Sequence, residues 1–158
     1  MTWREFAAVK SRLAELIHNL FFQYGPGLGY LATVRPDGGP RIHPVSPVVV
    51  DGQLYCFLVD SPKRRDLERD GRYALHAFPP ESTEDEAYLA GVARCVTDPA
   101  RVRRVASAVH AEPRVDWELY EFGIDVAMVV CRADSPTATI SDPTYERYVW
   151  RAPTAAAS

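Results

Sequence analysis

The stretch GYLATVRPDGGPRIHPVSPVVVDGQLYCFLVDSPKRRDLERDGRYALHAF, residues 29–78, determines most of the predicted fold. Apolar runs rich in β-branched and aromatic residues predict strands at 28–35, 41–50, 53–59 and 72–78. The first three strands are separated by turn residues, Pro36-Asp-Gly-Gly-Pro40 after the first and Asp51-Gly52 after the second. Because such short turns join neighbouring strands of a hairpin, the three strands are expected to run antiparallel. Ser61 is expected to cap a short helix that has Pro62 in its first turn and ends near Asp70.

The flanking segments complete a mainly β pattern. Apolar residues at three- and four-residue spacing predict one amphipathic helix over 2–24, opened by a capping box at Thr2 and Glu5. Beyond the central stretch, a helix is predicted from Asp98 to His110, a bulge or bend at Gly123, and strands at 86–97, 119–132, 137–140 and 145–150. The expected fold is an antiparallel barrel with peripheral helices, in one domain over 1–151 with a disordered tail at 152–158.

Composition excludes several classes of function. The 158 residues carry a formal net charge of −3, which indicates no global basic face and argues against nucleic-acid binding. No apolar run is long enough to cross a membrane, and the charged residues within 3–23 predict that this segment is not a signal peptide. Cys56, Cys95 and Cys131 are far apart, which predicts buried free thiols rather than a metal site or disulfides. A reducing cytoplasmic location is therefore expected.

Basic residues occupy the first turn of the central helix, where Lys63, Arg64 and Arg65 follow Pro62. A helix N-terminus already carries partial positive charge, so cations there are unfavourable unless an anion offsets them. Helix N-termini also bind phosphate well through their free amides. The pattern therefore favours a phosphate site, and the alternative is a solvated basic turn whose partners are Asp66, Glu68 and Asp70.

The second strand carries Arg41 and His43, two residues apart and therefore on one face. Ser46 lies on the opposite face unless a bulge at Pro44 or Pro47 reorients it. A cationic pair on an otherwise apolar strand, next to a basic helix terminus, favours an anionic ligand. We therefore expect Arg41 and His43 to contribute to the same site as Lys63.

The order of these motifs resembles the pyridoxamine 5′-phosphate oxidase-like family of split-barrel flavoproteins. The similarity covers residues 30–98, and its motifs are Leu31-Ala-Thr-Val-Arg-Pro-Asp-Gly, Arg41-x-His-Pro-Val, Leu54-Tyr-x-Phe, Ser61-Pro-Lys and Leu67-x-Arg-Asp. The resemblance implies a six-stranded split barrel that binds FMN and forms a homodimer with two cofactor sites at the subunit interface. It also implies an oxidoreductase in which FMN transfers two electrons to or from a small molecule.

The resemblance implies roles for individual residues as well. Arg41 and Lys63 would contact the cofactor phosphate, with Ser61 and Arg64 beside them. The segment His43, Pro44, Val45 and Ser46 would follow the ribityl chain and the isoalloxazine ring, and Cys56 and Phe57 would touch the flavin from the third strand. Four aromatic residues are candidates for the exposed face of the ring, namely Tyr88, Trp117, Tyr120 and Trp150.

The sequence also departs from the oxidase pattern. Ser46 replaces a lysine, Pro62 replaces an arginine, and residues 144–151 lack the arginine-histidine cluster that grips the substrate phosphate. An unassigned small-molecule substrate is therefore expected instead of a vitamin B6 compound. Alternative interpretations are a deazaflavin-dependent reductase on the same fold and a non-catalytic flavin- or heme-binding barrel. The candidate heme ligands are His18, His43, His76 and His110.

Overall fold

The computed structural model describes residues 1–111, 116–132 and 145–153 of the chain. Its helices are α1 (Trp3–Val9), α2 (Ser11–Phe22), α3 (Pro62–Arg69) and α4 (Pro99–Ala108). Its strands are β1 (Gly29–Val34), β2 (Pro40–Val45), β3 (Val48–Val50), β4 (Gln53–Leu58), β5 (Arg72–Ala77), β6 (Glu86–Cys95), β7 (Glu118–Arg132) and β8 (Tyr145–Arg151). The strand predicted at 137–140 and most of the tail predicted to be disordered lie outside the described residues.

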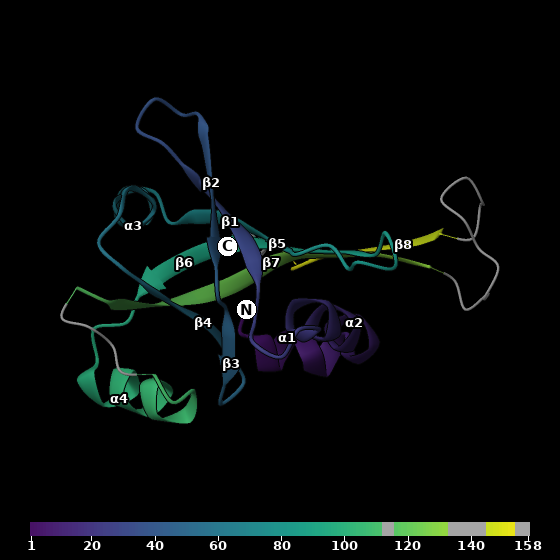
Figure 1. The fold of residues 1–158 in the computed structure, drawn as a ribbon, viewed down its shortest axis with the longest axis horizontal. Helices are drawn as coiled ribbons and strands as arrows, with labels where there is room; N and C mark the ends of the chain where they lie inside the picture. Colours follow the sequence, from purple (N-terminus) through teal and green to yellow (C-terminus); the bar gives the residue numbers. More distant parts are fainter. Residues whose placement is uncertain (112–115, 133–144, 154–158) are drawn as a thin grey trace.

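One antiparallel sheet contains all the described strands, in the order β2-β1-β5-β6-β7-β4-β3, and β8 pairs with β7. Among the described strands, no hydrogen bonds close this sheet into a ring. Instead the chain itself joins the two edges, because β2 leads directly into β3 through Ser46 and Pro47. The prediction of a mainly β, antiparallel split barrel is confirmed, with β2 and β3 as the two halves of one bent strand and β8 as an addition (Figure 1).

The prediction of one continuous strand over 41–50 is wrong, because Ser46 and Pro47 interrupt it between β2 and β3. Pro47 lies between β2 and β3, and Pro44 lies within β2 opposite Tyr30. Among the described strands, β2 pairs only with β1 and β3 only with β4. A proline, which has no backbone N–H to donate, is tolerated in such edge strands and not in central ones.

The single helix predicted over 2–24 is also wrong, because the structure divides it at Lys10. The capping box is present: Thr2 Oγ1 accepts from the Glu5 amide at 3.2 Å, and Glu5 Oε2 accepts from the Thr2 amide at 2.7 Å. Lys10 leaves the helical region, with φ −140° and ψ 56°. The break changes the direction of the chain, so that the apolar faces of α1 and α2 both reach the curved sheet.

The main core fills the inner face of the sheet. The helices α1 and α2 cover one part of this face, and α3 packs against β1, β2 and β6 in another part (Figure 1). A second, smaller cluster lies beneath α4 and contains Tyr55, Val96, Val105 and Leu119. The expectation that all three cysteines are buried holds only for Cys56, since Cys131 is half-buried and Cys95 is exposed at the end of β6.

A register shift bends β6 and β7 where the two strands cross the barrel. Ala90 pairs with Val126 but Gly91 pairs with Ile124, so Asp125 is an extra residue in β7. The bulge predicted at Gly123 thus lies two residues further along the chain. A Cβ atom on Gly91 would lie 2.0 Å from the Gly123 carbonyl oxygen, so the close approach of the two backbones requires glycine at this position.

None of the helices in the described part of the chain combines the length and the apolar character needed to span a membrane.

Candidate functional site

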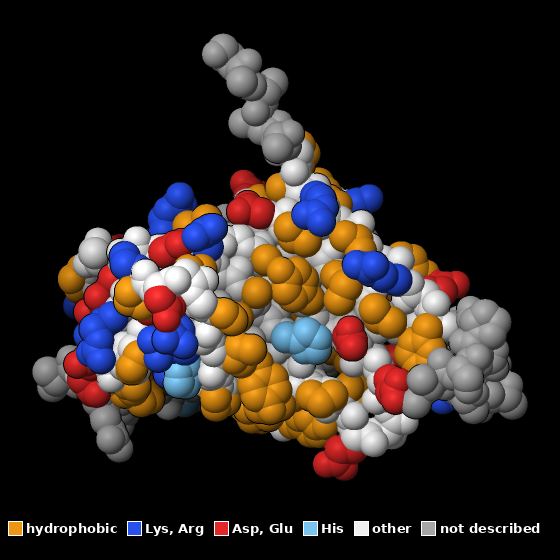
Figure 2. Space-filling model, turned by 90° about the horizontal axis from the view of Figure 1, so that it is seen from above, with side chains coloured by type: hydrophobic (Ala, Val, Ile, Leu, Met, Phe, Trp, Pro, Cys, Tyr) orange, Lys and Arg blue, Asp and Glu red, His pale blue; other side chains and the backbone are white. Residues whose placement is uncertain are grey.

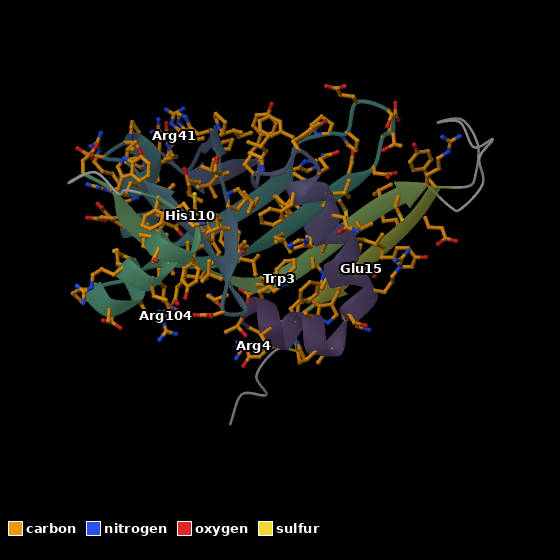
Figure 3. All side chains as sticks on the ribbon, turned by 60° about the horizontal axis from the view of Figure 1, so that its bottom comes forward. Trp3, Arg4, Glu15, Arg41, Arg104 and His110 are labelled. Atoms are coloured by element: carbon orange, nitrogen blue, oxygen red, sulfur yellow. The ribbon has the colours of Figure 1, made fainter. Side chains whose placement is uncertain are left out.

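The buried carboxylate of Asp66 joins α3 to the first two strands. Its Oδ2 atom accepts from Arg41 Nε at 2.7 Å and from Thr33 Oγ1 at 2.9 Å, while Oδ1 accepts from Arg69 Nη1 at 3.3 Å. The Asp66 side chain is only 2% exposed, whereas that of Arg41 is 27% exposed. Asp66 therefore fixes the position of α3 relative to β1 and β2. Figure 3 shows that Arg41 lies far from α1 and α2.

The ionisation of Asp66 follows from these contacts. Burial acts to raise the pKa of the carboxyl, but the hydrogen bonds from Arg41, Thr33 and Arg69 outweigh it. The pKa consequently lies below the ordinary value for an aspartate. Asp66 is thus an anion at neutral pH, held among two guanidinium groups.

Lys63 and Arg41 both lie near enough to His43 for their charges to act on it. Burial, followed by the positive charges of Lys63 and Arg41, lowers the pKa of His43, while Asp66 acts in the opposite direction. Arg41 and His43 are half-buried on the same face of β2. Lys63 forms no ion pair with any residue in the described ranges, although α3 contains two acids, Asp66 and Glu68. The structure therefore brings together two cations and a neutral histidine beside the start of α3.

The two arginines next to Lys63 have internal partners instead. Arg64 Nη1 donates to the Asp116 carbonyl at 2.9 Å, and its guanidinium lies within 4 Å of three acids, Asp60, Glu68 and Glu118. Arg65 Nη1 is 2.8 Å from Asp60 Oδ1. These acids offset the unfavourable charges in the first turn of α3, so the argument from the helix dipole applies to Lys63 alone.

Ser61 occupies the N-cap position of α3 and Pro62 the first turn, but the serine side chain does not cap the helix. Its hydroxyl donates to the Val59 carbonyl at 3.0 Å instead. The amides of the first turn therefore have no side-chain acceptor from the N-cap residue. This leaves them available to an external anion, whereas the sequence predicts an occupied cap.

The other residues in and next to β2 that are predicted to contact the flavin, Pro44, Val45 and Ser46, do not share one face of the sheet. Val45 is buried on the inner face with His43, while Pro44 and Ser46 are exposed. The Ser46 carbonyl accepts from Cys56 Sγ at 3.6 Å. The structure thus holds the backbone of this corner against β4, and it presents alternate side chains to opposite sides of the sheet.

Cys56 and Phe57 also point in opposite directions from β4. Cys56 lies in the main core, where burial raises the pKa of its thiol to about 12. Lys63 is close enough to act in the opposite direction, which places it near this end of the core. The Phe57 ring packs on the smaller cluster, 6.1 Å from the Trp117 ring. The side chains of Cys56 and Phe57 therefore do not form one common surface.

The four aromatic candidates for a ring-stacking surface are dispersed. Tyr120 is buried in the main core, Trp150 packs on Phe6 with ring centroids 5.1 Å apart, and Trp117 adjoins Phe57. Tyr88 alone among them lies half-buried on the outer face of the barrel. The histidines are dispersed as well, since His18 stacks on Phe22 of α2 and His110 follows α4, away from His43 on β2 and His76 on β5.

The outer face of the sheet is apolar and open. One row of outward-facing residues crosses six neighbouring strands and consists of Pro44, Tyr30, His76, Tyr88, Met128 and Val149. Tyr30 is 39% exposed, Val149 47% and, in the adjoining row, Ile42 63%. Figure 2 shows hydrophobic side chains gathered around a histidine in the middle of one face, with charged side chains of both signs around this area.

A cavity of about 890 Å³ borders this outer face next to Tyr30 and His76. Its wall contains one arginine, Arg132, and four carboxylates, of which Glu81, Glu84 and Asp85 belong to the loop before β6 and Glu86 is the first residue of β6. Such an excess of negative charge repels a phosphate. The cations beside α3 therefore remain the better candidate site for an anionic group.

Asp66 and Thr33 are the functional candidates that the sequence analysis missed. The sequence pattern predicts Asp66 only as a solvated partner of the basic turn, because its neighbours on α3 are almost all charged. The one available signal is that Leu67 must face the core, which brings Asp66 towards the sheet as well.

Comparisons with known proteins place the chain in a family. A family model described as pyridoxamine 5′-phosphate oxidase matches residues 17–127. A search of curated proteins gave no match. Among solved structures, the chain resembles a pyridoxamine 5′-phosphate oxidase-related, FMN-binding protein from Nostoc punctiforme, with TM-score 0.64, 11% identity, and coverage of 94% of this chain and 91% of that one.

Two further structures have the same fold. A putative pyridoxamine 5′-phosphate oxidase from Listeria innocua matches with TM-score 0.59 and 14% identity over 73% of this chain and 93% of that one. A heme-binding protein from Mycobacterium smegmatis matches with TM-score 0.61 and 15% identity over 86% of this chain, which spans 57% of the length of that protein. The matched family model covers most of the chain and agrees with the split-barrel topology, so the chain belongs to the pyridoxamine 5′-phosphate oxidase family.

Proposed function

We propose that this protein binds FMN and holds its phosphate between Lys63, Arg41 and the start of α3. The observation that carries the proposal is that Lys63 and Arg41 both have N–H groups without a hydrogen-bond or ion-pair partner among the described residues. Lys63 has no ion pair within the described residues, and Arg41 uses only its Nε atom on Asp66. These groups, with the uncapped first turn of α3, fit a phosphate monoester.

The other predicted contacts then follow from the position of β2. His43 is neutral at neutral pH because its pKa is lowered, so it can donate a hydrogen bond without adding charge. The Pro44–Ser46 segment would follow the ribityl chain through its backbone, and Cys56 would support that segment from beneath. Arg64 is a weaker candidate, since its guanidinium already lies among three acids.

The proposed activity is oxidation or reduction of an unassigned small molecule in a reducing, cytoplasmic environment. FMN, when bound, supplies the two-electron chemistry, and the chain contributes binding and orientation. A deazaflavin cofactor is the main alternative on the same fold. Support for FMN comes from the family match and from the FMN-binding relative in Nostoc punctiforme.

The visible spectrum of the protein purified without added cofactor tests the proposal, together with mass spectrometry of the compound that heating releases. We expect a flavin spectrum and the mass of FMN. A released deazaflavin would replace FMN with that cofactor, and a Soret band would favour a heme-binding barrel. A colourless protein that does not bind added FMN would reject the proposed site.

We also propose a homodimer that covers the apolar outer face. The support is the exposed hydrophobic surface around Tyr30, Ile42 and Val149, because contiguous apolar patches on proteins commonly mark interfaces. Ile42 and Arg41 are adjacent residues of the edge strand β2, with Ile42 on the outer face and Arg41 at the proposed phosphate site. A second copy that contacts Ile42 would therefore lie beside the edge of the sheet that holds the cofactor.

The substitution Ile42→Glu is expected to convert the dimer to a monomer, since it places a charge in the apolar contact. Sedimentation equilibrium measures the change. The matched control is Val9→Glu, because Val9 is 58% exposed but lies on α1, away from the outer face. A wild-type monomer with a full complement of cofactor would contradict the dimer and the interfacial site.

A further inference from the structure

The carboxylate of Asp66 accepts hydrogen bonds from two cationic side chains, of which one, Arg41, also belongs to the proposed phosphate site. We propose that Asp66 is a positioning residue that orients Arg41 towards the cofactor phosphate and thereby gives the site its preference for FMN over flavins without a phosphate. This inference rests on the proposed FMN site. It assigns to Asp66 no contact with the cofactor itself.

The orientation of Arg41 follows from the atom that Asp66 engages. The hydrogen bond uses Nε, and within the described ranges no hydrogen bond or ion pair occupies the two terminal nitrogens. A guanidinium group is planar, so fixing Nε against a buried carboxylate also fixes the direction of the terminal pair. Arg41 is thereby preorganised to donate two parallel hydrogen bonds to phosphate oxygens.

Asp66 also relates Arg41 to Lys63. Lys63 and Asp66 are three positions apart on α3, which places their side chains on neighbouring parts of the helix surface. Thr33 holds the same carboxylate oxygen from β1, and Arg69 joins its other oxygen and the Val34 carbonyl. The carboxylate therefore sets the separation between an arginine on β2 and a lysine on α3.

The local charge agrees with this role. Lys63, Arg41 and Arg69 are cations, Asp66 is an anion, and the lowered pKa of His43 leaves the imidazole neutral at pH 7. The net charge of the group is therefore about two positive. A phosphate monoester carries about −1.5 to −2 at this pH, so the group matches it closely. Without Asp66 the three cations would repel one another with no counterion to hold them in place.

The test compares the dissociation constants of FMN and riboflavin, which differ only in the phosphate. The proteins are the wild type, Asp66→Asn, Arg41→Gln and the double variant, each stripped of cofactor. Asp66→Asn is expected to raise the dissociation constant of FMN about tenfold, which corresponds to the loss of one charge-assisted hydrogen bond. The dissociation constant of riboflavin is expected to stay within about twofold of the wild-type value. In the Arg41→Gln background the same change is expected to have no further effect on FMN.

Asp70→Asn is the matched control, because it removes the same charge from the C-cap of the same helix, where the carboxylate contacts only the side chain and the backbone amide of Arg72 among the described residues. Equal weakening of FMN and riboflavin by Asp66→Asn, or an undiminished effect in the Arg41→Gln background, would show a general structural role and overturn the inference. A wild type that does not prefer FMN to riboflavin would instead reject the proposed phosphate site itself.

Thr33→Val provides a second variant if Asp66→Asn does not fold. It removes one neutral hydrogen bond from the oxygen that Arg41 uses, so a smaller loss is expected, about threefold for FMN alone. An unchanged ratio of FMN to riboflavin affinity in Thr33→Val would then overturn the inference.

Discussion

Replacement of Lys63 by alanine is expected to weaken FMN binding by about 10- to 100-fold, the loss of one charge-assisted contact of about 1.5–3 kcal/mol. Lys63 has no ion pair within the described part of the chain, so its removal leaves no buried acid uncompensated. The free energy of unfolding should therefore change little. Fluorescence titration of the stripped protein with FMN measures the affinity, and thermal unfolding without ligand measures the stability.

Arg65→Ala is the matched control for this prediction. It removes a cation from the same turn of α3, but the Arg65 side chain is 59% exposed and paired with Asp60. FMN affinity should stay within about threefold of the wild type, as expected for loss of a screened surface charge. Comparable losses in both variants would show that the basic turn attracts the cofactor only as a diffuse charge and that Lys63 makes no specific contact.

Gly91→Ala is expected to destabilise the fold by about 3 kcal/mol or more. The new Cβ would lie 2.0 Å from the Gly123 carbonyl oxygen and 3.1 Å from the Asp125 amide nitrogen. Both atoms belong to the backbone, so no side-chain rotation relieves the overlap, and β6 and β7 must separate at their bulge. Urea denaturation followed by far-ultraviolet circular dichroism measures the loss.

The control for the strand crossing is Gly123→Ala on the facing strand. A Cβ there would meet the Val92 carbonyl oxygen at 3.3 Å, which a shift of a few tenths of an ångström relieves. The stability of this variant is expected to fall by much less than that of Gly91→Ala. Equal stabilities of the two variants would contradict the close approach of the two backbones.

The sequence predicted the elements of the barrel well where turns and alternation are local. The hairpin between β1 and β2 and the turn at Asp51-Gly52 are present, and Asp98 caps α4 through the Ala100 amide. The local pattern failed where the direction of the chain depends on tertiary packing. Nothing in the residues around Lys10 marks the end of α1, because that break serves the fit of two helices to a curved sheet.

The candidate site was predictable in its cations but not in its anion. Arg41, His43 and Lys63 could be recognised because each is unusual at its place in a strand or first helical turn. Asp66 could not, since an acid among arginines on a short helix is expected to face solvent. Its burial depends on the packing of α3 on β1 and β2, a contact between segments about thirty residues apart.

The position of β2 at one edge of the sheet has a consequence for the dynamics of the protein. Hydrogen bonds to β1 and the contacts of Arg41 with Asp66 hold this strand, so its amides are expected to open locally at a lower free energy than those of β5 or β6. A ligand that binds only the closed form slows such opening in proportion to its saturation. Deuterium uptake in β2 would therefore report occupancy of the site by any compound, including substrates that have no colour of their own.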